Sequence, residues 1–134
     1  MYRTLCLASA AIGCLVATTA AAQDGLIGTW QDPKDSVHVR TQPCGNAICG
    51  VVIWATDQAK ERARRGGTQQ LIGTTVFRDF RQQKTNQWRG RVFVPDQNTT
   101  FSGTITLVDP NTIRGTGCLI GRIICKSRTW HRVP

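Results

Sequence analysis

The chain has 134 residues, of which 17 are Lys or Arg and 8 are Asp or Glu, so its formal net charge is +9. This length accommodates one domain of ordinary size rather than two. Hydrophobic residues make up 40% of the chain, which is enough for a core and excludes a chain that is disordered by composition. The excess of positive charge raises nucleic acid as a partner.

The first 22 residues have the features of an export signal. Arg3 precedes an apolar run from Leu5 to Ala17, and Ala20 to Ala22 fit a small-residue cleavage site. The run is shorter than the roughly 20 apolar residues that a membrane span needs. We therefore predict a cleaved signal peptide over residues 1–22, a single mature domain over 23–134, and no transmembrane segment. Lipid attachment at Cys14 is the alternative, and the apolar residues that follow it argue against it.

Export places the mature protein in the periplasm or the medium. Loss of Arg3 with the signal lowers the formal net charge from +9 to +8. An exported protein does not normally meet nucleic acid, so the positive charge favours another kind of acidic partner.

The mature sequence reads as a succession of short strands. Apolar and polar residues alternate with a period of two, most clearly over 101–107, which is typical of half-buried strands. About eight strands are predicted, over residues 26–32, 37–42, 49–55, 71–80, 88–94, 101–107, 113–118 and 123–130. Turn residues separate them at 32–35, 95–98, 109–111 and 120–123. The segment Asp57–Arg65, before Gly66 and Gly67, is either a short surface helix or a mobile loop.

Eight sequential strands joined by tight turns predict an all-β, up-and-down antiparallel barrel with little helix. An open sandwich is the structural alternative. An eight-stranded barrel has an interior that is filled by side chains or just holds one small ligand.

Four cysteines remain after the signal is removed, and an even number in an oxidising compartment indicates two disulfides. A hairpin turn within 120–123 places Cys118 opposite Cys125. A turn at Asn46 and Ala47 likewise places Cys44 opposite Cys49. We therefore predict the pairs 44–49 and 118–125, which staple two hairpins. The spacings disfavour both a redox C-x-x-C site and a zinc site.

An ordered set of short motifs carries a resemblance to a known family. The set comprises Gly28-Thr29-Trp30, Asp32-Pro33, Cys44-Gly45, Ile48-Cys49-Gly50, Val52-Ile53-Trp54, Leu71-Ile72-Gly73, Val76, Trp88-Arg89-Gly90, Phe101, Gly103, Gly117-Cys118, Cys125 and Thr129-Trp130-His131-Arg132. In this order the motifs resemble the bacterial exported family called domain of unknown function 2147, over essentially the whole mature chain. The chain departs from the family pattern at Phe101, where relatives tend to have Tyr, and in a shorter segment over 57–70.

The resemblance implies a lipocalin-like barrel and no established activity. The Gly28-x-Trp30 element is similar to the lipocalin signature, in which the Trp packs at the closed end of the barrel beneath an Arg of the last strand. The resemblance therefore implies a structural role for Gly28 and Trp30, with Arg132 or Arg128 above the indole.

The sequence contains no recognised catalytic motif and indicates no metal or cofactor. His38 alternates with the core valines of its strand, which favours a solvent-facing position, and His131 lies near the terminus. The aspartates at 32, 35, 96 and 109 all fall in turns, where Asp side chains cap the backbone. An enzyme whose site forms only in three dimensions stays a third possibility.

Two functional hypotheses follow. The first is a non-catalytic binding protein for a small apolar or amphipathic, lipid-like molecule, held by inward side chains at Val39, Ile53, Val76, Trp88, Val92, Phe101 and Ile105. The second is a cell-envelope module that binds acidic surfaces through a basic rim formed by Lys60, Arg62, Arg64, Arg65, Arg78, Arg81, Arg89 and Arg91. Among the other tryptophans, Trp54 is expected to pack in the core or at an end of the barrel, and Trp130 is expected on an outward face between cations.

Overall fold

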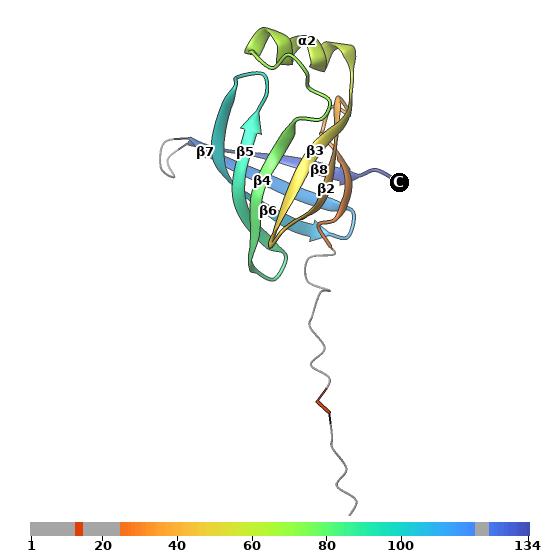
Figure 1. The fold of residues 1–134 in the computed structure, drawn as a ribbon, viewed down its shortest axis with the longest axis vertical. Coiled ribbons are helices and arrows are strands. Elements are labelled where there is room, and N and C mark those ends of the chain that lie inside the picture. Colours follow the sequence, from red (N-terminus) through yellow and green to blue (C-terminus); the bar gives the residue numbers. More distant parts are fainter. Residues whose placement is uncertain (1–12, 15–24, 120–123) are drawn as a thin grey trace, which may run out of the picture.

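The computed structural model describes residues 13–14, 25–119 and 124–134. The predicted signal peptide lies outside the described residues, apart from Gly13 and Cys14. Eight strands and one helix follow in chain order (Figure 1): β1 (Gly28–Gln31), β2 (Val37–Cys44), β3 (Ala47–Ala55), α2 (Asp57–Gly66), β4 (Thr75–Lys84), β5 (Gln87–Val94), β6 (Thr99–Asp109), β7 (Thr112–Leu119) and β8 (Ile124–Arg132).

The strands pair antiparallel in sequence order and close into a barrel, which confirms the predicted fold. The closure is narrow, because β8 pairs with β1 only at Trp30 with Arg132 and at Gln31 with His131 among the described residues. No helix in the described part of the chain is long and apolar enough to cross a membrane.

The alternation of side chains builds the core. Large residues such as Phe80 and Trp88 point inward, and glycines make room for them. Gly90 lies against the Phe80 side chain and backbone, and Gly103 lies against Val92. Any side chain at Gly90 or Gly103 would have to displace these neighbours, so the glycines fix how closely the aromatic core approaches the sheet.

Helix α2 lies across one end of the barrel (Figure 1). Its N-cap Thr56 accepts a hydrogen bond from the Ala59 amide, and Gly67 ends it in the left-handed conformation. Ala59 and Ala63, one turn apart, are buried and belong to the hydrophobic core. The segment for which the sequence left helix and loop open is therefore a capped helix that uses only small side chains to cover the barrel end.

A single arginine holds the other end. The Arg132 guanidinium lies over the Trp30 ring, with 4.3 Å from Cζ to the ring centroid. Its nitrogens donate to three carbonyl oxygens, of Pro110 at 3.0 Å, Ile27 at 2.8 Å and Gly25 at 2.9 Å. Of the two arginines that the resemblance offered, Arg132 is thus the one above the indole. A side chain at Gly28 would occupy the space of this guanidinium.

Buried polar groups fasten the segment before β1 to this end. The Trp30 indole N–H donates to the Leu26 carbonyl at 3.0 Å, and the Thr41 hydroxyl also donates to that carbonyl. The Gly28 amide in turn donates to the Thr41 hydroxyl oxygen at 3.0 Å. Leu26, Trp30 and Thr41 are almost fully buried. These bonds hold Leu26 in the core, so the end beneath Trp30 is filled.

Both predicted disulfides are confirmed, between Cys44 and Cys49 and between Cys118 and Cys125. Cys118 and Cys125 are register partners, as expected. The first pair differs from the expected geometry, because Cys44 lies opposite Ala47 and the bridge runs diagonally. The turn is at Gly45 and Asn46, where Gly45 has the left-handed φ of 61° that a tight turn requires.

The arginine at the closed end supplies a test of stability. We expect Arg132→Lys to lower the free energy of unfolding by about 2–4 kcal/mol, since an ammonium cannot reach three carbonyls and stack on an indole together. Arg114→Lys, on an exposed arginine of β7, is the control and should change stability by less than about 0.5 kcal/mol. Urea unfolding measures both, and equal effects of the two variants would contradict the assignment.

Candidate ligand-binding site

The seven residues predicted to line a cavity do not form one lining. Val39, Val76, Trp88 and Ile105 are buried in the continuous hydrophobic core. Val92 and Phe101 are half-buried. The expectation for Ile53 is wrong: it is 37% exposed, because it follows the buried Val52 on β3 and therefore points to the opposite, outer face.

The inner face of the barrel is uncovered along β7. Gly115 and Gly117 share a face with the buried Ile113, so their missing side chains would point inward. A Cβ at Gly117 would meet nothing nearer than the Ser102 carbonyl oxygen at 4.0 Å, and a Cβ at Gly115 would likewise have no neighbour closer than 4.0 Å. The core therefore stops short of these two positions.

Two cations of β8 border this uncovered face. Lys126 and Arg128 alternate with Trp130 and Arg132 along the strand, and register pairs Lys126 with Gly117 and Arg128 with Gly115. Both cations are exposed, and neither has an acidic partner within the described residues. We call Val92, Phe101, Gly115, Gly117, Lys126 and Arg128 the inner mouth.

The expectation that Trp130 faces outward is wrong, and the error hid the inner mouth. The Trp130 ring lies edge-on to Phe77, with 5.6 Å between centroids, and packs against the core. Because residues two apart on a strand share a face, Lys126 and Arg128 share the inward face of Trp130. The resemblance already placed Arg132 above Trp30. Because Lys126 and Arg128 share a strand face with Arg132, that placement could have revealed their inward position.

One buried donor lies on the same transverse row. Trp88 is paired with Ile105, Ile105 with Gly115, and Gly115 with Arg128. Trp88 is 1% exposed, and no described residue accepts a hydrogen bond from its indole N–H. A buried donor without a hydrogen bond lowers the stability of the folded state by about 1–3 kcal/mol. Such donors are rare in native proteins, so this one is a candidate contact for a ligand.

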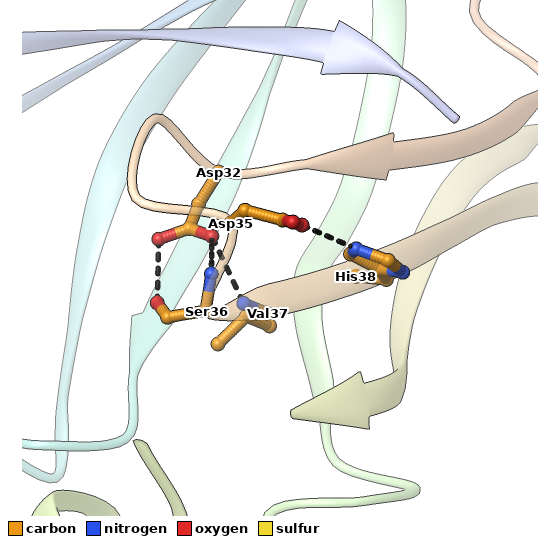
Figure 2. Close-up of polar contacts among 5 residues, drawn as sticks. All are labelled: Asp32, Asp35, Ser36, Val37 and His38. Atoms are coloured by element: carbon orange, nitrogen blue, oxygen red, sulfur yellow. Dashed lines mark hydrogen bonds and ion pairs between the residues drawn. The ribbon is translucent and has the colours of Figure 1, made fainter. Parts of the chain in front are cut away.

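The carboxylates of the β1–β2 turn are occupied by backbone and side-chain groups of the turn (Figure 2). Asp32 accepts from the Ser36 amide at 2.6 Å, the Ser36 hydroxyl at 2.7 Å and the Val37 amide at 2.9 Å. The Asp35 carboxylate lies 2.7 Å from Nε2 of His38. These contacts give Asp32 the capping role that the sequence predicted.

His38 lies on the outer surface, as expected, and contacts Trp54 with 4.5 Å between ring centroids. Trp54 is 42% exposed, so its expected place in the core is wrong. His131 is exposed, as expected. In the described ranges, no three His, Cys, Asp or Glu side chains gather in a group able to hold a metal ion.

The predicted basic rim divides into two groups. On α2, Lys60, Arg62 and Arg64 form ion pairs with Asp57, Asp96 and Glu61, while Arg65 has none to a described residue. On β4 and β5, register places Arg78 opposite Arg91 and Arg81 opposite Arg89. Within this second group Arg81 pairs with Asp79, and Arg78 lies over the Phe93 ring at 4.6 Å.

A shallow groove of about 470 Å³ lies on the outer face of the sheet. We call it the outer groove. Its lining comes from five strands and consists mainly of residues with polar end groups: Gln83, Gln87, Arg89, Ser102, Gly103, Thr104, Thr116, Cys118 and Cys125. Apart from Arg89, none of these residues was singled out as a ligand contact by the sequence, because each hydroxyl is an ordinary surface residue until the register brings them together.

The comparisons with known proteins agree with the barrel. The profile of a family described as "Uncharacterized protein conserved in bacteria (DUF2147)" matches residues 28–132. The chain belongs to this family, as its motifs indicated. No curated protein matches the chain.

One solved structure is similar in fold. It is described as "Protein HP1028 from the human pathogen Helicobacter pylori belongs to the lipocalin family". The two chains are 14% identical, the match covers 81% of this chain and 83% of the other, and the TM-score is 0.65. At this identity the likeness shows a lipocalin-like fold.

Two tryptophans test whether the Trp88 donor is unsatisfied. We expect Trp88→Phe to leave stability unchanged within about 1 kcal/mol, because removing an unpaired donor offsets part of the packing lost. Trp30→Phe removes a donor that is bonded to the Leu26 carbonyl, and should cost about 1–3 kcal/mol more. Urea unfolding compares them, and a Trp88 variant as destabilised as the Trp30 variant would mean that the Trp88 donor is bonded.

Proposed function

We propose that this protein is an exported, non-catalytic binding protein that holds one small amphipathic anion at the inner mouth. The observation that carries the proposal is an uncovered inner face on β7 beside two cations of the neighbouring strand β8, neither of which has an acidic partner among the described residues. The lipocalin-like fold supports it, since barrels of this size hold single small ligands. The two disulfides fit an oxidising compartment such as the periplasm or the medium.

The apolar part of the ligand would cover Val92, Phe101 and the backbone of Gly117. Val92 and Phe101 are half-buried, so each has apolar surface left to remove from water. Burial of apolar surface contributes about 25 cal/mol per Å², so every 100 Å² adds about 2.5 kcal/mol to binding. The missing side chains of Gly115 and Gly117 provide the room for an alkyl chain against the sheet.

The acidic head of the ligand would lie beside Lys126 and Arg128. Both are on the inward side of β8, one strand from the glycines. Arg offers a planar pair of donors to a carboxylate or phosphate, and Lys offers a mobile point charge. The Trp88 N–H, on the same row as Arg128, is a further donor that no described residue uses.

The basic rim gives weaker support for the alternative, binding to an acidic envelope surface through that rim. Three of its four cations on α2 are engaged with acidic groups of the same protein. Exposed charges that are paired within the protein attract an external surface less than free ones do. The arginines of β4 and β5 are a separate case, because Arg89 and Arg91 have no acidic partner in the described part of the chain.

A glycine substitution tests the proposed site directly. Decanoate is expected to change the tryptophan fluorescence of the wild-type protein, and Gly117→Leu, which fills the uncovered inner face, should abolish that change. The control is Thr106→Leu, which adds a similar side chain on the outer face of β6 and should leave decanoate binding unchanged. If Gly117→Leu binds decanoate as the wild type does, the ligand does not occupy the inner mouth.

Charge removal tests the head group and does not depend on how Gly117→Leu folds. The double variant Lys126→Gln, Arg128→Gln should bind decanoate about three- to tenfold more weakly, since exposed ion pairs contribute up to about 1 kcal/mol each. Lys84→Gln is the matched control, because Lys84 is an exposed cation at the end of β4. Equal losses in the two proteins would contradict a specific head-group contact.

A further inference from the structure

We propose that the outer groove is a second binding site, for a segment of an acidic polysaccharide that carries uronate carboxylates. It lies on the opposite face of the sheet from the inner mouth, so the proposal is independent of the proposed function. Its volume of about 470 Å³ belongs to a shallow groove that is open to solvent, which suits a stretch of an extended chain better than an enclosed small molecule. Two or three sugar rings would rest on a platform of side chains contributed by neighbouring strands.

Register arranges hydroxyl groups in rows across this face. One row runs from Arg89 through Thr104 and Thr116 to Ser127. The adjacent row places Ser102 beside the Cys118–Cys125 disulfide. The Thr116 and Ser127 hydroxyls bond each other at 2.8 Å. Those of Ser102 and Thr104 have no hydrogen bond to any described residue, and so are free to bind the hydroxyls of a sugar.

The charge of the face selects an acidic ligand. Arg89 lines the outer groove and has no ion pair with any acidic group of the described residues. Arg91 and Arg114 share the outer face of the same sheet and are likewise unpaired there. The strands β5 to β8 contain one acidic residue, Asp109, whose carboxylate accepts from the Asn111 amide.

The polar lining favours a polysaccharide over other acidic partners. Every described side chain that lines the groove carries an amide, a guanidinium, a hydroxyl or a disulfide, so the groove itself presents no large apolar side chain to a bilayer. No aromatic ring lines the groove either, so it lacks the stacking platform typical of proteins that bind single-stranded nucleic acid. The groove lies across the middle of a sheet, and strand addition by a peptide requires a free edge.

Calorimetric titration with a hexamer of galacturonate tests the proposal, with maltohexaose as the neutral control. The wild-type protein should bind the acidic hexamer, bind it more weakly as salt is raised, and not bind maltohexaose. Arg89→Gln should weaken binding at least fivefold. Arg64→Gln on α2, which removes a cation that is not part of the lining, should leave binding of the hexamer unchanged.

Removal of the hydroxyls separates a sugar site from mere attraction of charge. The double variant Ser102→Ala, Thr104→Val keeps every charge and retains a β-branched residue on the strand. It should weaken binding of the galacturonate hexamer at least threefold and leave binding of hexaglutamate unchanged. Equal losses for both ligands, equal affinity of the wild type for both, or tighter binding to phosphatidylglycerol vesicles would overturn the proposal. Unchanged decanoate binding by this variant would show that the inner mouth is intact.

Discussion

The barrel depends on one guanidinium at its closed end. Arg132 stacks on Trp30 and donates to backbone carbonyls from the segment before β1 and from the β6–β7 turn. It thereby joins the last strand, the first strand and a distant hairpin at a point where β1 and β8 share two register pairs within the described ranges. Gly28 is required beside it, because a side chain there would occupy the position of the guanidinium. Without this contact, the short pairing of β1 with β8 would leave the edges of these two strands weakly joined.

The same short closure determines where the proposed ligand would enter. The part of β8 that precedes His131 has no described pairing with β1. Lys126 and Arg128 in this part therefore lie on the inward face and yet remain exposed. Helix α2 covers one end of the barrel (Figure 1), and Leu26 fills the other end beneath Trp30. Neither of these two elements covers the inner face at Gly115 and Gly117 of β7. A fully filled barrel would need bulky residues at Gly115 and Gly117, and the chain has none there.

The sequence predicted the strand order, the barrel and both disulfides, because alternation and turn residues are local signals. It failed where one residue shifts the register. The extra residue at Ile53 brings Trp54 to the surface against His38, and alternation alone contains no sign of such an insertion. It also failed at Trp130, where flanking cations on one face look like a solvated surface. The outer groove could not be predicted from the sequence, because its lining residues come from five strands and become neighbours only through the strand register.

Two faces of one sheet thus carry different chemistry. The inward face offers apolar surface and two cations, and the outward face offers hydroxyls and arginines that have no acidic partner among the described residues. We propose that a small amphipathic anion occupies the inner mouth, and native mass spectrometry of protein purified from its own cells is the sharpest test of this proposal. We expect a 1:1 complex with an anionic amphipathic molecule in the wild type and the bare protein mass for Gly117→Leu. A bare mass for the wild type, or the same bound molecule in both proteins, would contradict it.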